Sequence, residues 1–282
     1  MTRRLDVATD DRVRDIVFAE YPGYRPLTLD LHLPAEPAAA IILFVHGGGW
    51  RVGSRRTFGP NFTAEQSFDR IVAAGFAVVS VDYRLSSEAH FPAQVDDVRA
   101  GLEWIRQHAA EYGLGSGPVI LWGESAGATL AALVGLEVDS GVSGVVDWFG
   151  PSNLTSMASL STPEELARTR ESLWLGGTAL EHPETARRAS PVFQVHPKSP
   201  PFHIEHGDAD QFVPFSQSQE LSNALHAVGA DVELRAVSGA NHLWNGVSDT
   251  APLIDRALAF AARVAALAPT EPTEPAEQAV NR

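Results

Sequence analysis

The nine residues from Val119 to Gly127, Val-Ile-Leu-Trp-Gly-Glu-Ser-Ala-Gly, constrain this chain more than any other stretch. Their apolar start has the length and content of a short buried strand, and residues 128–134 continue with an apolar helical pattern. The strand-to-helix turn between them has the G-x-S-x-G spacing of a nucleophile elbow. Glycines flank the serine because a turn this sharp leaves no room for side chains there. We therefore predict that Ser125 projects above the edge of a sheet as a nucleophile.

Strand and helix patterns alternate along the rest of the chain. Residues 27–33 alternate apolar and polar positions, whereas residues 40–45 are apolar throughout, which is typical of a strand covered on both faces. Further strands are expected at residues 77–81, 142–149, 201–206 and 231–237, and helices at residues 64–74, 94–112, 216–228 and about 250–267. This alternation predicts an α/β fold with a mostly parallel central sheet and helices on both faces.

The patterns indicate one catalytic domain over residues 1–267. Its first 26 residues are expected to form an N-terminal arm lying over the domain. The pattern loosens between about residues 152 and 190, where short helix starts and ends follow one another, and we expect a small cap insertion there. Residues 268–282 are rich in proline, glutamate and threonine, a composition that predicts a disordered acidic tail.

Composition excludes several classes of function. The net charge of −14 argues against nucleic acid or an anionic membrane surface as a partner. The chain has no cysteine, so disulfides, a thiol nucleophile and thiolate metal sites are excluded. No run of about 18 apolar residues is present, and acidic residues interrupt the basic start at the position where a secretion signal would be apolar. We expect a cytoplasmic protein that is not bound to a membrane.

A serine nucleophile needs a base, a group that orients the base, and an oxyanion hole. In an open α/β sheet these groups meet at the carboxyl ends of the strands. The strand expected at residues 201–206 is followed by Asp208 and Asp210, and the strand at residues 231–237 is followed by His242. The order serine, aspartate, histidine is the one expected for hydrolases with this elbow.

Further motifs follow in order between residues 27 and 245: Leu29-Asp30-Leu31-His32-Leu33-Pro34, His46-Gly47-Gly48-Gly49-Trp50, Asp82-Tyr83-Arg84-Leu85, Phe91-Pro92-Ala93-Gln94-Val95-Asp96-Asp97, His206-Gly207-Asp208-Ala209-Asp210 with Val213-Pro214, and Asn241-His242. With these motifs the chain resembles the α/β-hydrolase superfamily. The similar branch is that of hormone-sensitive-lipase-like enzymes and bacterial carboxylesterases of the feruloyl-esterase type, to which kynurenine formamidases are related. One departure is Gly127-Ala128, where Gly-Gly is commoner, and we expect it to be tolerated.

The resemblance implies the catalytic triad residue by residue. Ser125 would be the nucleophile, His242 the general base and then acid, and Asp210 the residue that orients the histidine. Asp208 competes with Asp210 for the last role, and the position of Asp210 three residues before Val213 favours Asp210.

The resemblance also implies an oxyanion hole made of backbone N–H groups, those of Gly48, Gly49 and Ala126. Glycine is needed here because a side chain would keep the substrate carbonyl away from the backbone. His46 is expected to support this loop rather than to react. No metal or organic cofactor is required, and His203 and His206 cannot readily share a metal because residues three apart on a strand face opposite sides.

We expect a serine carboxylesterase that hydrolyses a small or medium ester through an acyl-enzyme intermediate, with Trp50 and Trp244 lining an apolar pocket. The same triad would serve an amidase of the arylformamidase type, or a biosynthetic acyl transferase or cyclase, and these alternatives stay open. A hydrolase-fold protein that binds a ligand without turnover is a more remote alternative, since such proteins typically lack a triad residue. The oligomeric state stays open.

Overall fold

The structure is a computed structural model that describes residues 12–63 and 66–268 of the chain. Most of the expected acidic tail, residues 269–282, and the first 11 residues of the expected N-terminal arm therefore lie outside the described residues. Among the described residues, no helix is long and apolar enough to cross a membrane.

An eight-stranded sheet forms the centre of the molecule, in the order β1-β2-β4-β3-β5-β6-β7-β8. The strands are β1 (Arg12–Ala19), β2 (Leu27–His32), β3 (Ile41–Val45), β4 (Ala77–Val81), β5 (Val119–Glu124), β6 (Gly144–Trp148), β7 (Phe202–Gly207) and β8 (Val232–Val237). Strands β3 to β8 run parallel to one another, whereas β2 is antiparallel to both of its neighbours. The mostly parallel α/β sheet predicted from the alternation of elements is confirmed.

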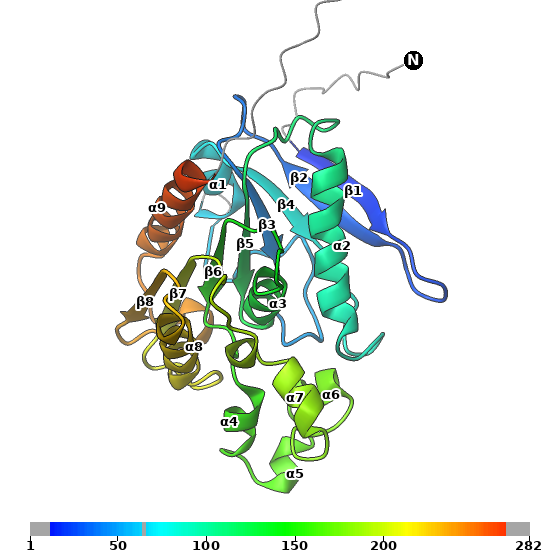
Figure 1. The fold of residues 1–282 in the computed structure, drawn as a ribbon, viewed down its shortest axis with the longest axis vertical. Helices are drawn as coiled ribbons and strands as arrows, with labels where there is room; N and C mark the ends of the chain where they lie inside the picture. Colours follow the sequence, from blue (N-terminus) through cyan, green and yellow to red (C-terminus); the bar gives the residue numbers. More distant parts are fainter. Residues whose placement is uncertain (1–11, 64–65, 269–282) are drawn as a thin grey trace, which may run out of the picture.

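Helices cover both faces of this sheet. They are α1 (Phe68–Ala73), α2 (Ala93–His108), α3 (Ala126–Gly135), α8 (Ser216–Ala227) and α9 (Ala251–Leu267). Helices α2, α3 and α8 share one apolar core with the sheet, and α1 and α9 share the other (Figure 1). Successive residues of a strand point to opposite faces, so Leu43 packs into the first core and Phe44 into the second. This arrangement explains why the central strands are apolar at every position.

Part of the expected N-terminal arm is a strand of the sheet. Residues 12–19 form β1, which pairs antiparallel with β2, and Ile16 and Phe18 pack against the core. The register shifts between Val13 and Ile16, so the alternation of apolar and polar residues is interrupted there. A strand of this kind does not show a strict alternation of apolar and polar residues. The expectation of an arm lying over the domain was wrong for residues 12–19.

The segment between β6 and β7 folds as a group of short helices: α4 (Leu154–Ala158), α5 (Pro163–Leu166), α6 (Arg170–Leu175), α7 (Pro183–Arg188) and the 3-10 turn η2 (Pro191–Phe193). Helices α4 to α7 gather at the bottom of Figure 1, beyond the sheet. Local signals delimit them, since Thr162 and Glu165 form a reciprocal capping box and Gly176 ends α6 in the left-handed conformation. Each of these boundaries therefore has a local cause in the sequence.

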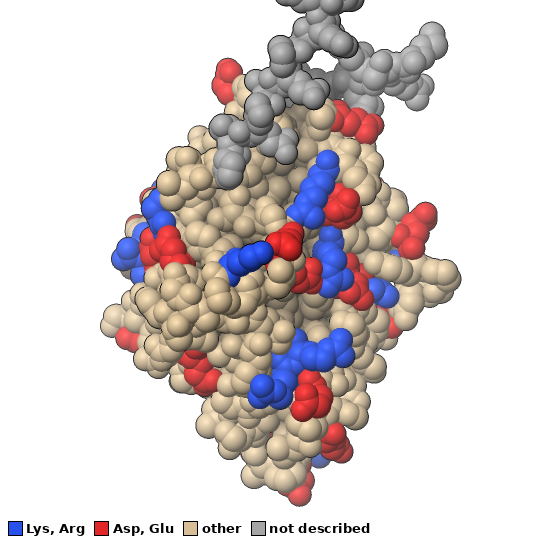
Figure 2. All heavy atoms as spheres, in the orientation of Figure 1, with Lys and Arg blue, Asp and Glu red and all other residues tan. Residues whose placement is uncertain are grey.

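Basic and acidic side chains lie beside one another on the face of the molecule shown in Figure 2. Arg99 forms exposed ion pairs of this kind with Asp96 and Glu137. Pairs as exposed as these contribute little to stability.

Candidate active site

The expected elbow forms at the junction of β5 and α3. Ser125 has φ 51° and ψ −120°, and its backbone N–H donates to the carbonyl of Trp148 in the neighbouring strand at 2.9 Å. A Cβ on Gly123 would lie 2.3 Å from the Gly127 carbonyl oxygen, and one on Gly127 would lie 2.1 Å from the Val45 carbonyl oxygen. Both flanking glycines are therefore imposed by close backbone contacts, as the sequence indicates.

Three strand ends bring Ser125, His242 and Asp210 together. The Ser125 Oγ lies 3.0 Å from His242 Nε2, and His242 Nδ1 lies 2.7 Å from an Asp210 carboxylate oxygen. With Nδ1–H donating to the carboxylate, Nε2 is left as an acceptor for the serine hydroxyl. All three side chains are buried, and Ser125 retains 8% exposure. The arrangement has the connectivity that proton transfer from a serine to a histidine requires.

Four donors surround the Asp210 carboxylate. One oxygen accepts from the N–H groups of Phe212 and Val213, and the other from His242 and His206. Burial raises the pKa of Asp210, but the hydrogen bonds from the two histidines, the charge of His242 and the Val213 N–H outweigh it. The pKa of Asp210 therefore lies well below its ordinary value, and the carboxylate stays ionised.

His206 belongs to the site although it was not predicted from the sequence. Its Nδ1 accepts from the Ser218 hydroxyl at 2.7 Å, which leaves Nε2–H to donate to Asp210 at 3.2 Å and to the Val213 carbonyl at 2.9 Å. The ring is completely buried. His203 points to the other face of the sheet, toward Phe260 of α9, so the two histidines of β7 do not meet. Among the described residues, no group of three or more potential ligands could hold a metal ion.

Two polar side chains tie together the loops that bear Asp210 and His242. The Asn241 side-chain oxygen accepts from the N–H groups of Gln211 and His242. Asp208 accepts from the Gly239 N–H at 2.7 Å. Asp210 and not Asp208 therefore contacts the histidine, and Asp208 instead braces the loop after β8.

The glycine loop after β3 lies next to the elbow. A Cβ on Gly48, at φ 120°, would lie 2.0 Å from the Val52 carbonyl oxygen, so only glycine fits there. The N–H groups of Gly48, Gly49 and Ala126 donate to no acceptor within residues 12–63 and 66–268. A Cβ on Gly47 would lie 3.6 Å from the Ser125 Cβ, which places the loop in contact with the serine. The donors are therefore available beside the serine.

His46 lies behind this loop. Its Nδ1 is 2.7 Å from the Gly47 carbonyl oxygen, its ring stacks on Tyr83 at 4.2 Å, and its own carbonyl accepts from the Tyr83 hydroxyl. Burial lowers the pKa of His46 to about 4, so the imidazole is neutral at physiological pH. Each contact holds the loop in place, and none reaches the serine.

Residues with positive φ gather around this site. Of the seven non-glycine residues with positive φ in the described chain, five are at the elbow, in the glycine loop or beside the histidine: Trp50, Ser125, Phe149, Leu243 and Trp244. Such conformations are unfavourable and persist where the surrounding structure enforces them, which is common at functional sites. Their distribution marks the same place as the side-chain geometry.

Trp50 and Trp244 occupy the core instead of a pocket wall. Each is only 1% exposed; Trp50 stacks on Trp174 at 4.2 Å, and Trp244 packs edge-to-face on Trp148 and Phe149. Neither lines the cavity beside the triad. Large aromatic rings next to a strand end fill the core when neighbouring rings enclose them, and sequence position alone does not reveal those neighbours.

A cavity of about 410 Å³ lies between the short helices after β6, the end of the glycine loop and the loop that follows Asp210, and we call it the cap-side cavity. Its lining includes Arg51, Leu154, Met157, Arg168, Arg170, Glu171 and Phe212. Phe212 connects it to the triad, because its ring centre lies 5.7 Å from that of His242. These residues were not predicted from the sequence, although Arg51 directly follows the His-Gly-Gly-Gly-Trp motif and the others lie in the expected cap or close to the triad acid.

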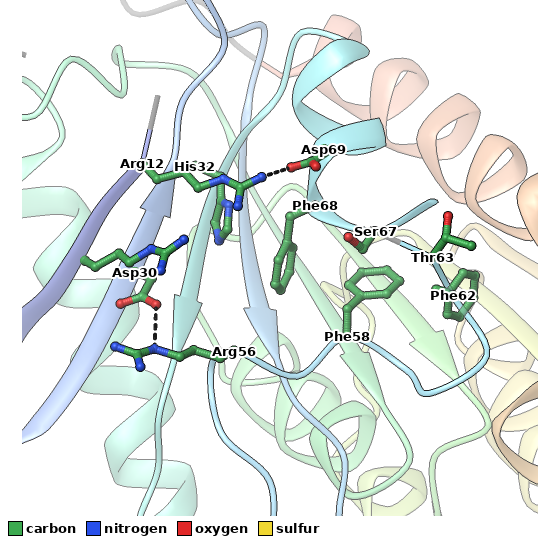
Figure 3. A pocket seen from close by; sticks show the side chains of 11 residues that line it. Arg12, Asp30, His32, Arg56, Phe58, Phe62, Thr63, Ser67, Phe68 and Asp69 are labelled. Atoms are coloured by element: carbon green, nitrogen blue, oxygen red, sulfur yellow. Dashed lines mark hydrogen bonds and ion pairs between the residues drawn. The ribbon is translucent and has the colours of Figure 1, made fainter. Parts of the chain in front are cut away.

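A second cavity, of about 300 Å³, lies between β1, β2 and α1 (Figure 3). Arg12 is paired there with Asp69, and Arg56 lies 3.5 Å from Asp30. His32 forms one wall, and its burial lowers its pKa to about 4. No residue of the triad lines this cavity, and neither of the rings that contact His242, Phe149 and Phe212, belongs to its lining, so it is separate from the candidate active site.

Glu124, the residue before the serine, is completely enclosed. Burial raises the pKa of its carboxyl to about 8 and outweighs the hydrogen bond from the Gly59 N–H, which acts in the opposite direction. No described basic side chain pairs with it, so the group is a neutral acid at pH 7. Its contact with Gly59 ties the segment after the glycine loop to the elbow strand.

Comparisons with known proteins agree on one relationship. Residues 29–225 match the family model described as BD-FAE. Esterase LipQ of Mycobacterium tuberculosis is 29% identical over 241 residues, which are 79% of this chain and 56% of that protein. The chain spans about half the length of the curated relatives it matches.

Solved structures share the fold over nearly the whole chain. A truncated carbohydrate esterase from gut microbiota is similar with a TM-score of 0.79 and 26% identity, covering 92% of this chain and 99% of that one. An esterase of Thermogutta terrifontis with bound propionate is similar with a TM-score of 0.68 and 26% identity, covering 91% and 96%.

Proposed function

The chain belongs to the BD-FAE family, whose model matches residues 29–225, and we propose that it is a serine carboxylesterase. The motif-based resemblance to esterases of the α/β-hydrolase fold is confirmed by this match and by the structural neighbours. The observation that carries the proposal is the hydrogen-bonded series from Ser125 through His242 to Asp210, beside backbone N–H groups that have no acceptor in the part of the chain that the structure describes.

In the proposed mechanism the Ser125 hydroxyl attacks the ester carbonyl while His242 Nε2, at 3.0 Å, takes its proton. The ionised Asp210 holds the ring in the required tautomer and stabilises the imidazolium. The histidine then gives the proton to the leaving alcohol, and an acyl group stays on the serine. A water molecule, deprotonated by the same nitrogen, hydrolyses this acyl-enzyme and releases the acid.

The N–H groups of Gly48, Gly49 and Ala126 would stabilise the negative charge that develops on the carbonyl oxygen. They are fixed before the reaction, since the Gly48 carbonyl accepts from the N–H groups of Arg51 and Val52 and Ala126 opens α3. Each such donor typically contributes about 10²–10³ in rate. The helix end adds a favourable partial positive charge at the same place.

We propose a small or medium ester as the substrate. The cap-side cavity of about 410 Å³ is at the lower end of the range for ligand sites. The bound propionate of the Thermogutta esterase and the carbohydrate esterase among the neighbours favour a short acyl group, on an alcohol that can be a sugar. We also propose that the insertion over about residues 152–190 acts as a cap, since this cavity lies beneath it.

The test is hydrolysis of p-nitrophenyl acetate and butyrate by the wild type and by Ser125→Ala. We expect turnover by the wild type and a loss of about 10⁴-fold or more in the folded variant. Equal activity in both proteins would refute Ser125 as the nucleophile. A folded wild type without turnover would instead favour a narrow amidase or an acyl transferase, to be tested with N-formylarylamines and with alcohol acceptors.

A further inference from the structure

Arginines without a carboxylate partner gather in the cap-side cavity. Arg51, Arg168 and Arg170 line it, and none of them forms an ion pair with a described residue. Glu171 is the acidic residue among the lining residues, and it pairs with none of the three. The cavity wall therefore carries two positive charges in excess, in a chain whose net charge is −14.

This grouping is unusual within the molecule. Most arginines of the described chain have carboxylate partners: Arg55 bonds Asp30 and Asp82, and Arg12 and Arg56 in the second cavity are paired as well (Figure 3). Like charges that share a cavity repel one another, and Glu171, the one acidic residue among the described residues of the lining, offsets that repulsion only in part. An anion bound among the three guanidinium groups would offset it.

Arg170 connects this charge to the reacting atoms. Its guanidinium lies over the Phe212 ring, 5.7 Å from the ring centre, and the same ring lies next to His242. Its side chain also packs on the glycine loop, because a Cβ on Gly49 would come within 2.3 Å of the Arg170 Cδ. The arginine thus lies between the expected oxyanion donors and the triad histidine's neighbour.

We infer that the cap-side cavity binds an anionic group, so that the preferred substrates are esters carrying a carboxylate in their acyl or alcohol part. A guanidinium matches a carboxylate with two parallel hydrogen bonds, which a neutral amide or hydroxyl cannot reproduce. The inference rests on the proposed esterase activity and specifies its substrate class.

Two matched pairs of esters test the inference. Monoethyl adipate, with the carboxylate on the acyl side, is compared with its neutral monoamide. The carboxylate 4-(butyryloxy)butanoate, with the charge on the alcohol side, is compared with its own amide. The measured quantity is the ratio of kcat/KM for the anionic ester to that for the amide, obtained by titrating the released acid at constant pH.

We expect this ratio to be about ten in at least one pair, a preference of ~1.4 kcal/mol. In Arg170→Gln it should fall several-fold, and in the variant with all three arginines replaced by glutamine it should approach one. Arg187→Gln is the matched control, because Arg187 also lacks a carboxylate partner but lies over Phe193, outside this cavity. It removes the same charge and should keep the ratio.

Salt gives a measurement that needs no substitution. The three arginines are exposed, so raising the ionic strength from about 0.02 M to about 0.5 M should lower the wild-type ratio. A wild-type ratio of one or less in both pairs would overturn the inference, as would a ratio unchanged in the triple variant or by salt. Failure of the proposed function looks different, since then neither the amides nor p-nitrophenyl butyrate would be hydrolysed.

Discussion

Asp208 and Asp210 show how two acids in one loop are assigned to different tasks. Asp210 contacts His242 and Asp208 contacts the Gly239 N–H, so only the first can act on the histidine. We expect Asp210→Asn to lower kcat by about 10⁴-fold, because an amide favours the wrong tautomer of the ring.

Asp208→Asn is the matched control for this comparison. Its amide oxygen can still accept from Gly239, so kcat should stay within a few-fold of the wild type. Steady-state kinetics on p-nitrophenyl butyrate distinguish the two, with circular dichroism to establish that both variants fold. A larger loss in Asp208→Asn than in Asp210→Asn would reverse the assignment.

Glu124 makes stability depend on pH near neutrality. Its pKa is about 8 in the folded protein and about 4.5 in the unfolded chain, so between these values the folded state holds a proton that the unfolded state releases. The free energy of unfolding therefore falls as pH rises through this window. Burial also raises the pKa of Asp147, to about 6, so this residue lowers the free energy of unfolding mainly as pH rises toward 6.

Glu124→Gln should reduce this dependence, since the amide oxygen can keep the bond from Gly59 without a titrating proton. Urea unfolding at several pH values between about 6 and 8 measures it. We expect the free energy of unfolding to decline less steeply with pH in the variant than in the wild type. Parallel profiles would show that Glu124 does not titrate in this range.

At the scale of elements, the packing of α3 against β3 depends on the absence of one methyl group. A Cβ on Gly127 would lie 2.1 Å from the Val45 carbonyl oxygen and 2.4 Å from that of His46, and backbone atoms cannot rotate away. Gly127→Ala should therefore lower the free energy of unfolding by about 3 kcal/mol or more, as α3 is pushed from the sheet.

Gly229→Ala separates this clash from backbone strain alone. Gly229 has φ 78° and nothing within 4 Å of its Cβ position, so alanine there should cost only about 1 kcal/mol. Chemical denaturation of both variants gives the comparison. A loss at Gly127 no greater than at Gly229 would show that the elbow helix shifts easily.

Periodicity predicts the elements that have regular neighbours on both sides. Strand β3 and strand β5 are apolar at nearly every position because each is covered by helices on both faces, and this pattern is visible in the sequence. Strand β1 is not predicted from the hydrophobic pattern, because its register shifts and most of its residues are partly exposed. Edge strands with such irregularities leave little trace in a hydrophobic pattern.

At the scale of the whole molecule, the sequence predicts the triad because each member follows a strand and the strands are parallel. It does not predict the cap-side cavity, because Arg51 comes from the loop after β3 and Arg170 from the insertion, more than a hundred residues later. Their meeting depends on how the short helices dock. The prediction that Trp50 and Trp244 line a pocket was wrong for the same reason, since rings that pack against them, such as Trp174 and Trp148, are distant in sequence.

The sheet order also gives the strands that precede Ser125 and His242 different protection against local opening. Ser125 follows β5, which has a partner strand on each side, whereas His242 follows β8, an edge strand whose residues are partly exposed or exposed. Amide hydrogens of β8 should therefore exchange with solvent faster than those of β5. On warming, we expect the loop after β8 to open first and to carry His242 away from Ser125 while the core stays folded. Catalysis should therefore cease reversibly several degrees below the cooperative melting transition.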